Sequence, residues 1–190
     1  MSRGYIIMTR IPKIKQLQTT AAGTITINWD LVEQIIGFQL HDNLKNFYSR
    51  ILGSKNKYGT ISGQIKFNPV GFVKRYVNRE DWLVNANNTS HAELSLDLLT
   101  ETDVAYVVDY LQEAFKGAWT GGNDFGNRAY IGDILINMGQ ITLVFNNDTG
   151  KFEWVDFGYG YFEVYEENPY GIVADHTQEF LDKFMLVKKC

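Results

Sequence analysis

The sequence predicts a single α+β domain in which an antiparallel β-meander packs with several helices. Residues 131–157 form three apolar runs joined by short turns. The clearest helical period precedes them at Asp103–Phe115, and another follows at His176–Leu186. A chain of 190 residues fits one domain, and a hydrophobic share of 45% is enough for a real core.

The expected strands are rich in Ile, Val and Phe and are separated by turn residues. The meander is predicted at Ile131–Asn137, Gln140–Asn146 and Lys151–Phe157, with a fourth strand at Tyr161–Tyr165 and short strands at Thr24–Asn28 and Gln64–Phe67. We expect residues 78–98 to be irregular and the stretch around Asn168, Pro169 and Gly171 to be a solvated loop.

The expected helices are marked by capping signals and one-sided apolar faces. Asp30 and Glu33 have capping-box spacing before Gly37, and Asn68-Pro69 suits a helix start. The predicted apolar faces are Leu44, Phe47, Tyr48 and Ile51 in a helix over 41–52; Val104, Val107, Val108, Leu111 and Phe115 in the helix over 103–115; and Phe180, Leu181 and Phe184 in the last helix.

Residues 1–20 are basic and lack a sustained period. They predict a flexible arm or an edge strand ahead of a domain over 21–190, and Met8 is a possible alternative start. Cys190 is the only cysteine, so we expect no disulfide framework and a cytoplasmic location. We expect no secretory signal, and no apolar stretch approaches the roughly 20 residues that span a bilayer.

The net charge of −4 hides an asymmetry between the two parts of the chain. Residues 1–79 carry +9 and residues 80–190 carry −13, with eight carboxylates and one lysine in 151–182. One interpretation is that the halves pack together and neutralise each other. The other is an acidic face for a basic partner, which argues against nucleic acid as the main partner.

The chain carries no motif that supports a catalytic, metal or cofactor site. Asp124-Phe-Gly126 matches the kinase metal-binding tripeptide, but no phosphate-binding glycine loop accompanies it. His41, His91 and His176 are scattered without metal-ligand spacing, and surface or capping roles are expected for His41 and His176. Paired carboxylates leave a small hydrolase as an alternative.

Two stretches, 29–53 and 130–185, resemble the SUKH superfamily. In the first, Glu33, Gly37, Leu40 and the Phe47-Tyr48 pair follow the family's order of a glutamate, a Leu-Gly, a Leu-Pro and a helix with Phe-Leu or Phe-Tyr, although His41 stands in place of the proline. The second stretch has a similar set of positions, which is Ile131-Gly132-Asp133, the strand Ile141–Phe145, Gly150, Trp154 and Phe180-Leu181.

The resemblance implies a compact, non-enzymatic α+β domain. Many bacterial members are immunity proteins that neutralise a cognate toxin, often a nuclease, and others are regulatory interaction modules. We therefore expect a basic toxin domain as the partner, while the oligomeric state stays open. The alternating aromatic and acidic stretch gives the candidate contact residues, which are Trp154, Asp156, Tyr159, Tyr161, Glu163, Tyr165, Glu166 and Glu167.

Overall fold

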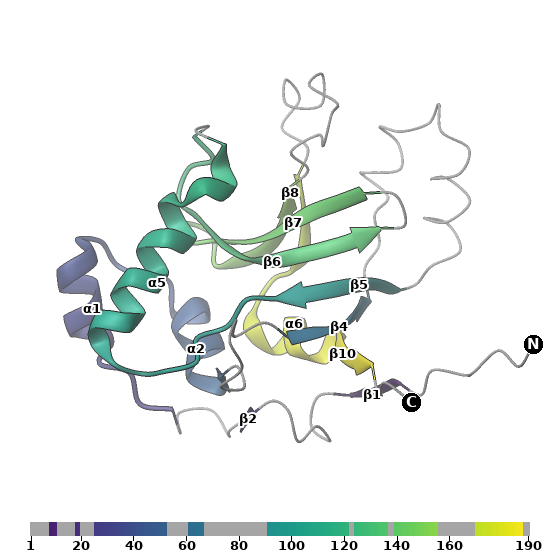
Figure 1. Ribbon diagram of the computed structural model, residues 1–190, viewed down its shortest axis with the longest axis horizontal. Coiled ribbons are helices and arrows are strands. Elements are labelled where there is room, and N and C mark those ends of the chain that lie inside the picture. The colour runs from purple at the N-terminus through teal and green to yellow at the C-terminus, as the bar shows by residue number, and fades with distance from the viewer. Residues whose placement is uncertain are drawn as a thin grey trace, which may run out of the picture.

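The computed structural model describes residues 8–10, 18–19, 25–52, 61–66, 91–121, 124–136, 139–155 and 170–187. Within them, an eight-stranded sheet has the order β1-β10-β4-β5-β6-β7-β8-β9, and every neighbouring pair is antiparallel (Figure 1). Its strands are β1 Met8–Arg10, β4 Ile61–Lys66, β5 His91–Leu96, β6 Arg128–Ile136, β7 Gly139–Asn146, β8 Lys151–Val155, β9 Tyr170–Ala174 and β10 Phe184–Val187. A separate pair joins β2 (Gln18–Thr19) to β3 (Ile51–Leu52).

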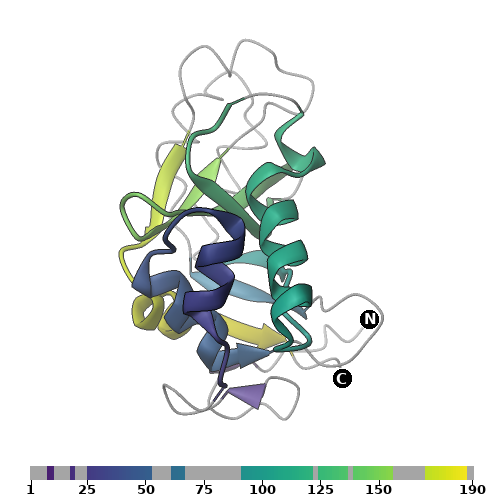
Figure 2. The ribbon, with the colours of Figure 1, turned by 90° about the vertical axis from the view of Figure 1, so that its left-hand side faces the viewer.

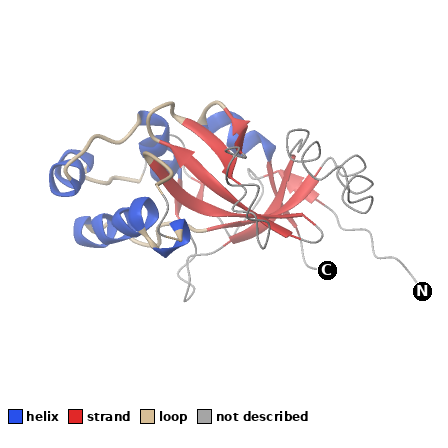
Figure 3. Ribbon diagram, turned by 90° about the horizontal axis from the view of Figure 1, so that it is seen from above, coloured by secondary structure: helices blue, strands red, loops and turns tan. Residues whose placement is uncertain are grey.

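Three of the described helices gather at one end of the molecule, and the last one lies beside the strands (Figure 1). The described helices are α1 Trp29–Ile36, α2 Asp42–Arg50, α5 Val104–Lys116 and α6 Thr177–Lys183, with a 3-10 turn, η2, at Ala118–Thr120. Helices α1 and α5 lie side by side (Figure 2). From above, helices lie at one end of the strands and along one edge of them (Figure 3). The expected fold class, a single α+β domain, is confirmed.

The predicted meander is present as β6, β7 and β8, which pair in sequence order. The predicted strand at Tyr161–Tyr165 lies outside the described residues. Strand β8 pairs with β7 on one side and with β9 on the other. Gly171 therefore lies in a strand, and the prediction of a solvated loop around it was wrong for β9. A Cβ at Gly171 would lie 2.3 Å from Nε1 of Trp154, so this glycine permits close packing of two strands and does not mark a turn.

An aromatic cluster holds α2 and α6 against β7 and β8. The Phe152 ring stacks on Phe180 at 4.4 Å and meets Phe47 edge-on at 5.5 Å, while Phe145 meets Phe152 at 5.2 Å. All four side chains are fully buried. Burying one such side chain stabilises the fold by about 1.5–3 kcal/mol, so this cluster is a major part of the core.

Helix α5 follows its sequence signals closely. The Asp103 carboxylate accepts the N–H groups of Ala105 and Tyr106, and Gly117 follows the last helical residue. The predicted inner face is confirmed, because Val107, Val108, Leu111 and Phe115 are buried and Val104 is half-buried.

Residues 91–96 differ from the prediction of irregular chain. They form β5, in which buried Leu94 and Leu96 alternate with exposed or half-exposed neighbours.

Helix α1 begins earlier than the capping-box spacing suggested. Asn28 is its N-cap and accepts the N–H of Leu31, so Asp30 is a first-turn residue and not the cap. Glu33 instead accepts the N–H of Leu40 at 2.8 Å and binds Nζ of Lys45 at 3.1 Å. The predicted strand at Thr24–Asn28 is absent over residues 25–28, where the chain bends into this cap. The expected stop at Gly37 is confirmed by its φ of 85°.

Several boundaries also differ from the prediction. The last helix ends at Lys183, because Phe184 starts β10 and pairs with Ile65. Helix α2 ends at Arg50, and the next two residues form β3. Within the basic segment 1–20, β1 pairs with β10 as an edge strand, which was one of the two expected outcomes. The helix expected after Asn68 lies outside the described residues.

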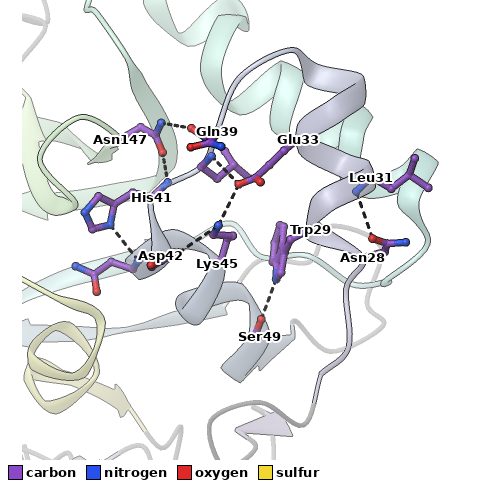
Figure 4. A network of polar contacts seen from close by, with 12 residues as sticks. Asn28, Trp29, Leu31, Glu33, Gln39, His41, Asp42, Lys45, Ser49 and Asn147 are labelled. Carbon is purple, nitrogen blue, oxygen red and sulfur yellow. Dashed lines mark hydrogen bonds and ion pairs between the residues drawn. The ribbon is translucent and has the colours of Figure 1, made fainter.

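The start of α2 and the β7–β8 turn form a polar joint, which we call the α2 joint (Figure 4). The Asn147 side chain accepts the N–H of His41 at 2.7 Å and donates to the Gln39 carbonyl at 2.9 Å. Asn43 donates to the carbonyl of Gly150 at 2.9 Å. Residues more than 100 positions apart are thereby fixed in register.

Candidate functional site

The predicted contact stretch is only partly testable in this structure. Trp154 is 4% exposed and belongs to the core, so its assignment as a surface contact was wrong. Its strand places it on the same face as buried Phe152, which points toward the helices. The other seven candidates, Asp156, Tyr159, Tyr161, Glu163, Tyr165, Glu166 and Glu167, lie outside the described residues.

The two histidines expected to cap helices do so. His41 Nδ1 accepts the N–H of Asn43 at 3.1 Å, and His176 Nδ1 accepts the N–H of Glu179 at 3.2 Å. Each ring nitrogen that accepts these bonds is committed to a helix start. In the described part of the chain, no group of three or more His, Cys, Asp or Glu side chains could hold a metal ion.

The one fully buried carboxylate among the described residues is Glu153, which is 3% exposed. Its Oε2 accepts from Nε of Arg128 at 2.8 Å, and its Oε1 accepts from Asn146 at 3.0 Å. A catalytic acid needs a desolvated carboxyl that faces a substrate. Both oxygens of Glu153 are bound inside the protein, which identifies it as part of the scaffold.

Charge is distributed unevenly over the described surface. Among the basic side chains whose exposure is described, Lys116 is exposed, and Lys45, Arg50, Arg128, Lys151 and Lys183 are half-buried. The exposed acids are Asp30, Asp42, Glu93, Glu101, Asp103, Asp109, Glu113, Asp124, Asp148, Asp175 and Asp182. The described surface is therefore predominantly acidic, although parts of the basic N-terminal segment are not described.

Helix α1 exposes two large apolar side chains. On α1, Leu31 is 40% exposed and Ile35 is 52% exposed. They are four residues apart and share one face, while Val32 points into the core. Leu31 points away from the side of α1 where Glu33 meets Lys45 (Figure 4). Large apolar side chains exposed as neighbours favour an interaction role for this face of α1.

Two hollows flank Phe38 at the end of α1. The first, which we call the aromatic cleft, measures about 470 Å³ and is lined by Phe38, Phe115, Lys116, Trp119, Thr120, Asp124, Phe125, Gly126 and Asn127. The second measures about 510 Å³ and is lined by Asp30, Glu33, Gln34, Gly37, Phe38 and Gln39. Phe38 is the one residue that lines both hollows, which lie near the ends of α1 and α5.

Internal bonds fix the walls of the aromatic cleft. Nε1 of Trp119 donates to the Ala114 carbonyl at 2.8 Å, which ties the indole to the end of α5. The Phe125 ring stacks on Trp119 at 5.9 Å, and Arg128 donates to the Phe125 carbonyl at 2.7 Å. On the opposite wall, Phe38 packs edge-on against Phe115 at 5.0 Å. The cleft is thus preformed.

Asp124 lies at the glycine-rich part of the cleft. Its Oδ1 accepts the N–H of Gly126 at 2.8 Å, and Gly126 has a φ of 66°, which favours glycine. The kinase-like tripeptide is therefore an aspartate-capped turn. The carboxylate is exposed and, as an ionised group, has further lone pairs that can accept hydrogen bonds from a ligand.

Sequence reasoning missed this site because it treated the glycine-rich loop as a connection. A usable signal was present, since Phe115, Trp119 and Phe125 are large aromatics on both sides of that loop. The exposure of Ile35 had no such signal, because Ile35 lies three residues after buried Val32 and helical spacing alone would place both on one apolar face. None of the described helices is long and apolar enough to cross a membrane. Comparison with known proteins finds no matching family model, no matching curated protein and no matching solved structure.

Proposed function

We propose that this chain is a cytoplasmic immunity protein that binds and neutralises a basic toxin domain, without being an enzyme itself. The observation that carries the proposal is the exposed surface of α1 and α5. It combines exposed acids, such as Asp30 and Asp109, with the exposed apolar pair Leu31 and Ile35. Acidic groups accelerate encounter with a basic partner, and buried apolar anchors slow release.

A nuclease-type toxin is the partner that this surface fits best. Such an enzyme must hold phosphates with lysine and arginine, so its active surface is basic. An acidic protein can cover that surface and exclude the nucleic acid. The carboxylates within 156–167 remain proposed contacts for the same basic partner.

The resemblance to the SUKH superfamily supports this proposal through the architecture of the chain. The positions that carry the resemblance have structural roles here: Gly37 is left-handed, Leu40 is buried, and Phe47 and Tyr48 are fully buried. Partner-binding side chains would therefore lie on surrounding surfaces, where related proteins with different partners can differ.

The test is co-expression with the product of the adjacent gene, with complex formation and protection of cells as two separate measurements. The variant pair Asp30→Lys and Asp109→Lys alters exposed acids of α1 and α5. Its matched control, Glu93→Lys with Asp182→Lys, makes the same change of charge on β5 and α6. We expect slower association and a weaker salt dependence for the first pair only, with both proteins folded.

A second variant, with Glu163, Glu166 and Glu167 all changed to lysine, tests the C-terminal acids in the same way. Equal binding by wild type and both sets of variants would remove these patches from the interface. Binding without protection would favour a regulatory interaction module. Hydrolysis of any member of a substrate panel would contradict the non-enzymatic assignment.

A further inference from the structure

The aromatic cleft has the features of a site for one flat cation. We propose that it binds a guanidinium group, which the basic partner would present as an arginine side chain. The source of the arginine rests on the proposed function, whereas affinity for guanidinium is a property of the cleft itself. An experiment can therefore contradict the guanidinium site without contradicting the immunity function, and the reverse.

Planar aromatic surface is the first requirement, and the cleft provides it. Trp119 and Phe125 line the hollow and stack on each other with ring planes 25° apart, and Tyr130 also contacts Trp119 at 6.2 Å. Both Trp119 and Phe125 keep part of their surface exposed. A guanidinium is planar and weakly hydrated, so it stacks on such faces more readily than a compact ammonium does. This geometry favours arginine over lysine.

Rigid walls are the second requirement. The Trp119 indole N–H is bound to the Ala114 carbonyl, so the ring keeps its orientation when the cleft is empty. The backbone that carries Phe125 is held by Arg128, whose own charge is balanced by Glu153. A preformed site loses little conformational entropy on binding, which favours affinity for a small group.

A negative charge beside the rings is the third requirement. Asp124 lines the hollow, and one of its oxygens is used by the Gly126 turn. Its remaining lone pairs can accept from a guanidinium that stacks on the neighbouring Phe125. Asp30 and Glu33 line the adjoining hollow, although Glu33 is paired with Lys45.

Lys116 is the group that opposes a cation, since it also lines the cleft. It is exposed, and its long stem can place the ammonium in solvent. Its charge would still repel a bound guanidinium. This opposition gives a signed test, because removal of Lys116 and removal of Asp124 should act in opposite directions.

The experiment titrates the full-length protein with three neutral-ended amino-acid probes, the N-acetyl methylamides of arginine, lysine and leucine. The readout is the indole N–H resonance of Trp119, assigned with Trp119→Phe. We expect the arginine probe to shift this resonance with millimolar affinity and the lysine probe to bind several-fold more weakly. Asp124→Asn should weaken arginine binding about three-fold or more, and Lys116→Gln should strengthen it, while Glu93→Gln has no effect.

The probe titrations test the guanidinium site without the toxin. No shift with the arginine probe, or an equal shift with the leucine probe, would overturn the proposal. Equal binding by the lysine and arginine probes would also overturn it, because stacking of the planar group would then contribute nothing. If Asp124→Asn leaves arginine binding unchanged, the assigned charge contact is wrong. A partner complex that survives any of these results would leave the immunity function standing while removing the cleft from it.

Discussion

The α2 joint and the aromatic cleft both contain loops with glycine, asparagine and aspartate, yet they differ in where their polar atoms point. In the joint, the Asn147 amide uses both its oxygen and its nitrogen inside the protein. At the cleft, Asp124 is exposed and half-exposed rings line a hollow. Composition alone does not separate a structural loop from a recognition loop. What separates them is whether the polar side-chain atoms bond inside the protein or face solvent.

The two regions also differ in how much room surrounds their glycines. A Cβ placed on Gly150 would lie 2.2 Å from the His41 ring, so the joint has no room for even a methyl group. A Cβ on Gly126, at the cleft, meets only the end of the flexible Arg128 side chain at 3.6 Å. The joint is close-packed to its surface, whereas the cleft keeps a volume of about 470 Å³ for a ligand.

The largest expected effect comes from the support beneath the cleft. Leu111 is fully buried on α5, the helix that carries Phe115 and anchors Trp119. Leu111→Ala should lower the free energy of unfolding by about 2–5 kcal/mol, because a cavity is left in a packed core. Urea denaturation measures this, with exposed Gln112→Ala as the control. A loss under about 0.5 kcal/mol would show that the helix does not pack as described.

A glycine pair tests the packing of the joint. Gly37 and Gly150 both have a positive φ, at 85° and 71°, but only Gly150 is enclosed by another side chain. Gly37→Ala should cost about 1 kcal/mol, the backbone term alone. Gly150→Ala should cost about 2–4 kcal/mol, because the His41 ring must also move. Equal losses in chemical denaturation would mean that the joint is looser than the structure shows.

An asparagine pair compares the two regions directly. Asn147→Ala removes two hydrogen bonds to backbone groups in the joint and should cost about 1–3 kcal/mol. Asn127→Ala, at the cleft, removes one exposed bond to Asp148 and should change stability by less than about 0.5 kcal/mol. Thermal and urea unfolding of both variants measure the difference. Similar losses would contradict the division into a structural and a recognition loop.

The sequence predicted the fold better than the site for a physical reason. Helix α5 and the β6–β8 meander were predictable because their periods are local, as Val107 and Leu111 illustrate. Strand β9 was not, because Gly171 is explained only by Trp154, which lies 17 positions earlier and across a strand pair. The cleft depends on Phe38, just after α1, meeting Phe115 of α5, a long-range contact that no local pattern records.

The smallest expected effect concerns acid pH and the ion pairs of α6, which adjoins the joint. The hydrogen bond from Lys183 and the backbone N–H of Asp175 hold the pKa of Glu179 below its usual value of 4.5, and the hydrogen bond from Lys151 lowers the pKa of Asp175 below 3.8. A carboxyl with a lowered pKa in the folded state stabilises the fold above its unfolded pKa. That contribution is lost as the pH falls through the folded value.

The free energy of unfolding should therefore change little between pH 7 and 5 through these groups and should decline once the pH falls below about 4.5. Lys183→Gln should flatten part of that decline, since it removes the main cause of the low pKa of Glu179. Half-exposed pairs of this kind contribute only about 0.2–1 kcal/mol, so the change will be small at pH 7. Lys116→Gln, at the cleft, is the matched control and should leave the slope as in wild type. A flattened slope for both variants would point to general charge rather than to the Lys183–Glu179 pair.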